Sequence, residues 1–475
     1  MSAVANRFEP MVATIARKEF AELLRDGRFR WSAAIVLALL VVAVLAGARY
    51  QRDLVAQQQT AQSTEQSRWY KQPPKNPHSA AHYGLYAFKP RLAPAFLDPG
   101  VEPYTGVAVW IEAHKQNEML FRPAEDATLA QRFGDLTVAL VLQALLPLVI
   151  VLLAFNTFAG ERERGTLRQL LAIGLRARDL VLGKALGLSA ALGVIVVPAL
   201  ALGAVALALA APTAGAGRFV PLAGIYLGYL GVFALVSLAV SARAATPRLA
   251  LVTLLGFWAL NCLVAPRAMA AVAGSLHPLP EPVAFKARMK AELGDPHGAP
   301  TTLQNTVAAL LKQHNVTKPE DLPINVRGLQ LQLGEEHGYQ IFDRYYGELF
   351  GQMEAQNRVL RGGAALFPLL GVQSLSTALA GTDFAQHRDF VQASEHYRRL
   401  VQKLMNDEIT ARPLKAGEVY FADHALWEKV PAFTYTPASA ATLLARNATP
   451  LALLGLWLVV AAALAWRSAA ALRPV

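Results

Sequence analysis

Two closely spaced histidines are the residues of this sequence whose spacing best suits a metal ion. His78 and His82 are four positions apart, so a helix would place both rings on one face. Pro77 directly precedes them, and no third ligand is evident near them in the sequence. We therefore expect an ordinary surface pair and no metal site. The single Cys262 lies in a long apolar run, which excludes an intramolecular disulfide and a cluster of thiol ligands.

Short catalytic motifs are the second feature from which chemistry could be inferred. The phosphate-binding pattern G-x-x-x-x-G-K-[ST] does not occur, because Gly183 and Lys184 lack the upstream glycine at the required spacing. The hydrolase pattern G-x-S-x-G and the metalloprotease pattern H-E-x-x-H do not occur either. We expect that the chain is not an enzyme and binds no cofactor itself. Any ATP, with its Mg²⁺, would then be bound and hydrolysed by another subunit.

The composition is that of a membrane protein. Among its 475 residues 54% are hydrophobic, and the mean hydropathy is +0.31, which is too apolar for an ordinary soluble chain of this size. A helix of about 20 apolar residues crosses a hydrocarbon core of about 30 Å. We predict an all-α polytopic fold with six transmembrane helices, at residues 31–48, 137–158, 185–211, 219–240, 249–266 and 450–466.

The net charge of +11 predicts the orientation of these spans. Lysine and arginine are densest in four segments, and basic loops stay on the cytoplasmic side of a membrane. Both termini are therefore expected in the cytoplasm. The excess positive charge is explained by this topology and by contact with the lipid bilayer, and it implies no nucleic-acid partner. The four segments are 1–31, 159–184, 242–248 and 467–475.

The charged insert at residues 159–184, AGERERGTLRQLLAIGLRARDLVLGK, separates two long apolar runs. Leu167, Leu170 and Leu171 recur at helical spacing, with Thr166 as the expected cap and Gly174 as the expected stop. A short helix with an apolar stripe and charged flanks, outside the membrane, suits docking into a groove on a soluble partner. The alternative is an arginine-rich loop that only sets the topology.

The N-terminal segment, residues 1–30, contains an amphipathic helix by its periodicity. Apolar residues, among them Phe20, Leu23 and Leu24, fall on one helical face, and charged residues such as Lys18 fall on the other. Such a helix lies in the cytoplasmic interface before the chain turns into the membrane. The alternative is a membrane-surface anchor with no protein partner.

Two of these stretches resemble a known family. The string ERERGTLRQLLA, followed by Gly183 and Lys184 where the next span begins, resembles the signature loop of permease subunits of type-2 ABC transporters. The string KEFAELLRDGRF resembles the elbow helix with which these permeases begin. The resemblance implies ATPase-coupling residues Glu161, Arg162, Glu163, Gly165, Thr166, Leu167, Leu170 and Leu171, and elbow-helix residues Lys18, Glu19, Phe20, Leu23 and Leu24.

The resemblance also implies partners and a location. A separate cytoplasmic ABC ATPase would carry ATP and Mg²⁺, and a second copy of the chain or a related permease would complete the complex. The location would be the bacterial inner membrane. Gln143 and Asn156 in the second span and Asn261 in the fifth are candidate pathway residues, because polar groups inside a span need partners and often mark a route for substrate.

Two regions are predicted outside the cytoplasm. Residues 49–134 are rich in turns, and residues 267–448 form a mainly helical domain in which 268–274 could dip back into the membrane. The stretch GVQSLSTALAGTDFAQHRDFVQASEHYRRL resembles an uncharacterised C-terminal domain of one bacterial subgroup of these permeases, which also shares NPHSAAHYGLYAFKP and DPGVEPYTG. Helices are expected in this domain near 282–293, 301–314, 326–360 and 383–408.

Three functions are compatible with these features. The leading one is an ABC transporter permease, with export as the expected direction. In the second, the same complex transmits force to a periplasmic or outer-membrane partner through the large outer domain. In the third, the chain is a membrane enzyme or sensor that works without an ATPase. Co-purification of an ABC ATPase would discriminate the third function from the first two.

Overall fold

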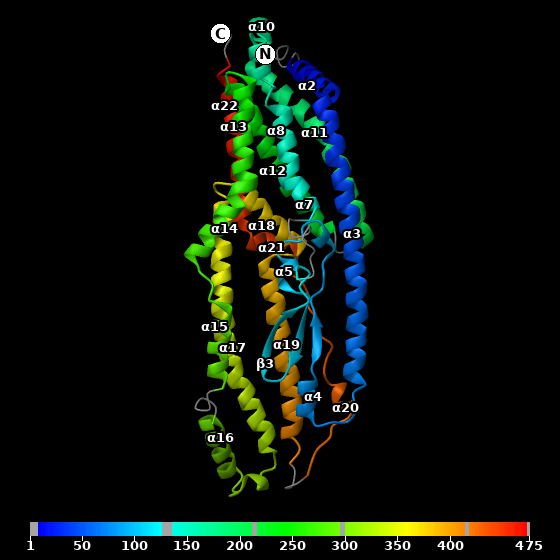
Figure 1. Ribbon diagram of the computed structural model, residues 1–475, viewed down its shortest axis with the longest axis vertical. Helices are drawn as coiled ribbons and strands as arrows, with labels where there is room; N and C mark the ends of the chain where they lie inside the picture. The colour runs from blue at the N-terminus through cyan, green and yellow to red at the C-terminus, as the bar shows by residue number, and fades with distance from the viewer. Residues whose placement is uncertain (1–7, 126–134, 211–215, 295–299, 414–417, 473–475) are drawn as a thin grey trace.

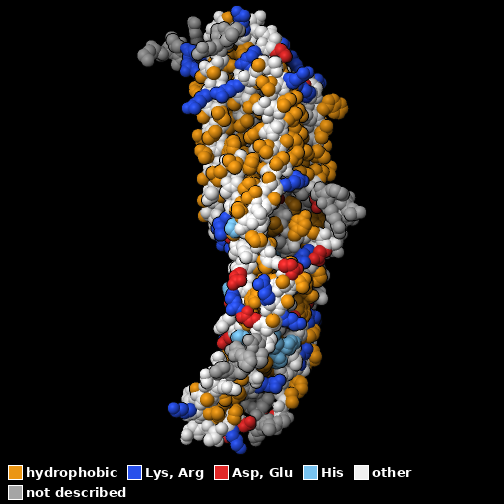
Figure 2. Space-filling view, turned by 60° about the vertical axis from the view of Figure 1, so that its left-hand side comes forward, with side chains coloured by type: hydrophobic (Ala, Val, Ile, Leu, Met, Phe, Trp, Pro, Cys, Tyr) orange, Lys and Arg blue, Asp and Glu red, His pale blue; other side chains and the backbone are white. Residues whose placement is uncertain are grey.

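The computed structural model describes residues 8–125, 135–210, 216–294, 300–413 and 418–472. The molecule is elongated, with an apolar half that contains both ends of the described chain and a distal half that projects from it (Figure 1). Hydrophobic side chains cover the apolar half almost continuously, whereas charged side chains are scattered over the distal half (Figure 2). The outermost parts of the predicted segments 1–30 and 467–475 lie outside the described residues.

Six helices in the described residues are long and apolar enough to cross a membrane, which confirms the predicted number. Several of them are interrupted, or extend beyond the predicted bounds. The first of the six is α3 (Gly27–Tyr70), and the second consists of α7 (Val138–Leu140), η2 (Val141–Leu145), α8 (Leu146–Ala154) and α9 (Ala159–Glu163). The third is α11 (Ala177–Ala210) and the fourth is α12 (Ala216–Arg243). The fifth consists of α13 (Pro247–Ala259), η3 (Leu260–Val264) and α14 (Ala265–Leu276), and the sixth is α22 (Ala448–Ala470).

Helix α3 is much longer than the first predicted span, residues 31–48. Asp26 caps its N-terminus by accepting a hydrogen bond of 2.8 Å from the Arg28 backbone N–H. Its 44 residues correspond to about 66 Å at 1.5 Å per residue, so the helix runs from the apolar half deep into the distal half. Its second part is polar yet helical because Trp69 and other side chains on one face pack against distal elements.

The fifth apolar helix is also continuous beyond its predicted end at residue 266. Residues 268–274 continue it as α14 and do not turn back. The reason is that a π-helical turn at Leu260–Val264 carries the chain past Pro266 without breaking the helix.

The distal half contains the four helices expected in 267–448, each within a few residues of its predicted bounds. They are α15 (Pro282–Leu293), α16 (Pro300–Gln313), α17 (Val326–Gly363) and α19 (Phe384–Thr410). A fifth helix, α18 (Pro368–Ala380), was not expected, because nearly all of its residues are buried or partly buried and no polar face marks it as amphipathic. The remaining short elements are α4 (Pro77–Tyr83), η1 (Ala93–Phe96), α5 (Glu102–Thr105), η4 (Pro319–Asp321), α20 (His424–Trp427) and α21 (Ala440–Arg446).

The turn-rich region at residues 49–134 contains a small antiparallel sheet that the sequence did not suggest. Its three strands follow the order β1 (Leu85–Phe88), β2 (Ala108–Glu112) and β3 (Lys115–Leu120). Leu85 pairs with Ile111, and Glu112 pairs with Lys115 across the hairpin. The sheet packs on α19, so the two predicted outer regions form one domain.

That domain has its own hydrophobic core, separate from the core of the apolar half. Trp427 is completely buried at its centre, and the Trp69 ring meets it edge to face with a centroid distance of 6.2 Å. The Trp69 indole N–H also donates to the Trp427 carbonyl at 3.2 Å. The end of α3 is thereby fastened to the last distal segment, more than 350 residues further along the chain.

Candidate functional site

The charged insert lies at the end of the apolar half where the described chain begins and ends (Figure 1). It forms two short helices, α9 and α10 (Thr166–Ala172), followed by the first turns of α11. The N-terminal helix α2 (Phe8–Arg25) packs along α11 beside them. Two glycines of α11 permit this contact, because a Cβ on Gly183 would lie 2.5 Å from the Cβ of Ile15 and a Cβ on Gly187 would lie 2.6 Å from that of Glu19.

A buried ion cluster joins these elements. The Lys184 ammonium of α11 lies 2.5 Å from Oε1 of Glu19 in α2 and 2.8 Å from Oε1 of Glu161 in α9. Lys184 is 2% exposed, and Glu161 is 5% exposed. Lys18 adds a second positive charge, with its ammonium 3.7 Å from Oε1 of Glu161. Two cations thus balance two carboxylates, as a buried ion cluster requires.

Arg162 fastens α9 to a fourth element. Its guanidinium donates to the carbonyl oxygens of Ala242 and Ala244, both at 2.5 Å. These carbonyls lie at the C-terminal end of α12, where the helix dipole favours a positive charge. The hydroxyl of Ser241 adds a further link by accepting from the backbone N–H of Phe158 at 2.9 Å. Helix α9 is therefore held to α2, α11 and α12 by direct polar contacts.

Helix α10 begins differently from the prediction. Gly165 occupies the N-cap position with φ of 76°, a left-handed conformation that favours glycine. Thr166 is not the cap, and its hydroxyl donates to the Glu161 carbonyl at 3.2 Å. The predicted stop is confirmed: Gly174 has φ of 91°, its N–H donates to the Leu171 carbonyl, and the next N–H donates to the Leu170 carbonyl.

The predicted docking stripe of α10 faces the protein itself, which corrects our expectation. Leu167 is 4% exposed, and Leu170 and Leu171 are partly buried against the same core. The stripe was misassigned because periodicity identifies an apolar face but not the surface that covers it. The exposed part of the insert carries Glu163, Arg164, Arg168, Gln169, Ala172 and Ile173, of which Ile173 is 76% exposed.

The other elbow-helix residues lie as an amphipathic helix requires. Phe20, Leu23 and Leu24 pack against the core of the apolar half, and Glu19 enters the ion cluster. The Lys18 side chain is about half exposed and also lies 3.3 Å from Glu22. The structure therefore brings the predicted elbow residues and Glu161 together. Their role in coupling stays a prediction.

Two of the three candidate pathway residues make hydrogen bonds within the chain. Gln143, in the π-helical turn η2, donates to the Tyr226 hydroxyl at 3.0 Å, and Asn261, in η3, accepts from the Leu369 backbone N–H at 3.3 Å. Asn156 lies beside Gly160, where its side-chain oxygen fills the space that a Cβ would take. These contacts stabilise the packing of the spans, and a role in transport is not tested by them.

A buried carboxyl group next to Gln143 was missed. Asp98 accepts hydrogen bonds from the Ser376 hydroxyl at 2.6 Å and from the Gly100 backbone N–H at 3.2 Å. Burial raises the pKa of Asp98, although these hydrogen bonds oppose the shift. Its sequence context, DPG, indicated only a turn. Asp98 also accepts from the Gln143 side chain at 3.4 Å, which links it to the second apolar helix.

The histidines also differ from the prediction. His114, which is remote from His78 and His82 in the sequence, lies against both, so three imidazole rings meet where only a pair was expected. Its place at the tip of a hairpin could not be inferred, because the hairpin itself was not expected.

Comparison with known protein families finds one match, which covers part of the chain. Residues 292–436 match the model of a domain of unknown function, DUF3526. The match covers α16, α17, α18 and α19, and it includes the stretch GVQSLSTALAGTDFAQHRDFVQASEHYRRL. No curated protein matches the chain.

Proposed function

We propose that this chain is the permease subunit of an ABC transporter that moves a substrate across the bacterial inner membrane. The proposed direction is export. ATP would be hydrolysed by a separate cytoplasmic ABC ATPase. The observation that supports this most directly is the buried cluster of Glu19, Lys184 and Glu161. A push on the charged insert would be transmitted through it to the apolar helices.

The proposed contact surface is the exposed part of the insert. Arg164, Arg168 and Ile173 are exposed on the insert. Helix α10 lies at the end of the molecule (Figure 1), and lysine and arginine side chains gather at that end (Figure 2). Closure of the ATPases on ATP would displace this surface, and the ion cluster with Arg162 would move α2, α11 and α12 as one body. A second copy of the chain, or a related permease, would supply the opposite wall of the pathway.

The first experiment tests the orientation of the insert. Cys262 is replaced by alanine, Ile173→Cys is added, and whole cells are treated with a membrane-impermeant maleimide. Ile173→Cys should stay unlabelled until the membrane is broken, whereas Val419→Cys, an exposed position of the distal half, should be labelled at once. Labelling of Ile173→Cys in intact cells would contradict the proposal.

The second experiment tests the partner. The first step is to determine whether an ABC ATPase is encoded beside this gene; the chain is then co-expressed with that ATPase and co-purified. Ile173→Asp and Arg168→Glu should abolish co-purification and stimulation of ATP hydrolysis, because both side chains are exposed and their replacement leaves the core unchanged. Val419→Asp is the matched control in the distal half. Equal ATPase binding by all variants would exclude the insert as the docking surface.

A second candidate function has one specific observation in its favour. Helix α3 continues without a break from the apolar half to Tyr70, so a tilt of its first part would displace the distal domain. In this version the complex transmits force to a periplasmic or outer-membrane partner and passes no solute. Reconstituted vesicles that export a substrate without any outer partner would exclude force transmission as the only function.

A further inference from the structure

Three histidine rings meet in the distal half, far from the charged insert. His78 and His82 lie one turn apart on α4, whose N-terminus is capped by the Asn76 side chain accepting from the His78 backbone N–H at 2.9 Å. His114 comes from the two-residue turn between β2 and β3. One nitrogen from each ring lies within 4.8 Å of those of the other two. The Nε2 atoms of His78 and His82 are 3.2 Å apart.

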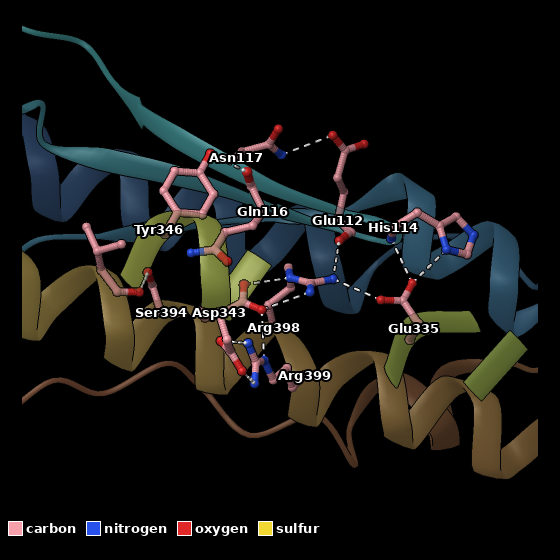
Figure 3. A network of polar contacts seen from close by, with 12 residues as sticks. Glu112, His114, Gln116, Asn117, Glu335, Asp343, Tyr346, Ser394, Arg398 and Arg399 are labelled. Atoms are coloured by element: carbon pink, nitrogen blue, oxygen red, sulfur yellow. Dashed lines mark hydrogen bonds and ion pairs between the residues drawn. The ribbon is translucent and has the colours of Figure 1, made fainter. Parts of the chain in front are cut away.

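The position of His114 is strongly constrained. Its φ of 63° lies in the left-handed region, which a histidine adopts at a cost in free energy. The preceding N–H, of Ala113, donates to the Ala81 carbonyl of α4 at 3.1 Å, which holds the hairpin tip against that helix. The His114 backbone N–H donates to Oε1 of Glu335 at 2.7 Å (Figure 3).

Glu335 also orients the His114 ring. Its Oε1 lies 2.8 Å from Nδ1 of His114, while its Oε2 accepts from the guanidinium of Arg398 at 3.0 Å (Figure 3). A carboxylate at Nδ1 holds the proton on that nitrogen and leaves the lone pair of Nε2 free for a metal ion. The Arg398 side chain is 1% exposed, and its guanidinium donates two hydrogen bonds to the carboxylate of Glu395. Arg398 is thereby held in place, and it holds the carboxylate of Glu335.

We propose that His78, His82 and His114 bind a divalent transition metal ion of the Zn²⁺ class, with Glu335 as the residue that positions His114. Three imidazole nitrogens suit Zn²⁺, Cu²⁺ or Ni²⁺, whereas Mg²⁺ and Ca²⁺ require oxygen ligands. Three protein ligands leave a fourth tetrahedral position for water or for a donor from another molecule.

The surroundings admit an ion. A pocket of about 430 Å³ opens beside His78, and His82 and His114 are exposed. Arg327 also lines this pocket and disfavours a nearby cation, but the carboxylate of Glu335, which contacts the His114 ring, opposes that effect. The ion would join α4 and the hairpin to α17, and hence the first distal region to the segment that matches the family model.

The test uses the full chain, purified in detergent through an affinity tag without histidine and stripped of metal. Titration with Co²⁺ should give the visible absorption bands of a tetrahedral site with one ion per chain, and Zn²⁺ should displace it. His78→Gln and His114→Asn should abolish these bands. Asparagine is chosen because it tolerates the left-handed conformation at position 114. His424→Gln, at an exposed histidine elsewhere in the distal half, should bind as the wild type does.

A second variant separates positioning from folding. Glu335→Gln should weaken Zn²⁺ binding about 10–100-fold, the usual effect of losing a carboxylate that orients a histidine ligand. Thermal unfolding without metal identifies variants that are merely unstable, and a folded His114→Asn chain is the decisive sample. If that chain binds Co²⁺ with the wild-type spectrum and affinity, or if the wild type binds neither ion at micromolar concentration, the three rings form only a hydrogen-bonded cluster and the proposal is wrong.

Discussion

Lys184 is the residue on which the joint between α2, α9 and α11 depends. Its ammonium lies between two carboxylates in a site that is nearly closed to solvent. Moving such charges out of water is unfavourable, and only their mutual attraction offsets it. The cluster is therefore sensitive to the loss of one member and much less sensitive to replacement of all its charges.

This asymmetry gives the first prediction. Lys184→Met should destabilise the protein by about 3–5 kcal/mol, because it leaves the buried Glu19 and Glu161 with only the half-exposed Lys18 as a cation. The triple variant Lys184→Met, Glu19→Gln, Glu161→Gln should regain most of that stability, since no unpaired charge remains. Denaturant unfolding in detergent measures both. A triple variant less stable than Lys184→Met would show that the three residues do not act as one cluster.

The burial of His387 in α19 leads us to predict that the folded protein loses stability in acid. Burial, with Lys89 and Arg122 near by, lowers its pKa to about 3, against 6.5 for an ordinary histidine. Between these values the unfolded chain binds a proton that the folded chain does not, so stability falls as the pH falls from 6.5 towards 3, by about 1.4 kcal/mol per pH unit. His387→Gln should remove that part of the slope.

The measurement is the free energy of unfolding at several pH values. Wild type and variant are compared, because the contributions of all other titrating groups are the same in both and cancel in the difference. His396→Gln, at an exposed position of the same helix, is the control and should follow the wild-type curve. Parallel curves for wild type and His387→Gln would contradict the prediction.

At the scale of elements, the close contact of α2 with α11 depends on glycine. Gly187 faces Glu19 and Ala16 so closely that any side chain would force the two helices apart. Gly193, six residues further along α11, has open space where a Cβ would stand. The two positions form a matched pair, because they share one helix and differ in what covers them.

Alanine at these two positions should therefore have opposite effects. Gly187→Ala should destabilise the protein by about 1–3 kcal/mol through overpacking. Gly193→Ala should be neutral or stabilise it by up to about 1 kcal/mol, because alanine is the better helix former. Unfolding measures the energies, and hydrogen exchange should show faster exchange of α2 only in Gly187→Ala. Equal protection of α2 in both variants would refute the close contact.

At the scale of the whole molecule, the distal half is one domain built from two distant parts of the chain. Trp427, Trp69 and the sheet share a core with α19, so neither part can bury its apolar side chains alone. The same domain carries the histidine cluster and the segment that matches the family model.

Trp427→Ala should accordingly loosen both parts together. Loss of a buried tryptophan costs about 3–5 kcal/mol, and hydrogen exchange should rise in β2 as well as in α19. Trp466→Ala, at a position of α22 that is 49% exposed, is the control and should leave the distal amides unchanged. Faster exchange in α19 with β2 unaffected would mean that the two parts are independent.

Local sequence was sufficient for the features that depend on neighbouring residues. Six apolar runs predicted six helices long enough to span a membrane, because hydropathy over about 20 residues decides that property. The helices near 282–293 and 326–360 were found from their periodicity and from flanking Pro and Gly, and Gly174 ends α10 because only a left-handed residue satisfies the last carbonyls there.

Only the tertiary structure decided which elements meet. That Glu19 lies against Lys184, that Leu167 faces inwards, and that His114 joins His78 and His82 all depend on contacts between residues distant in the chain. The three-stranded sheet and the shared core of the distal half likewise depend on contacts between distant residues. Periodicity shows that a face is apolar or that a side chain could bind a metal, but the surface opposite is supplied by another part of the chain, and local sequence holds no information about it.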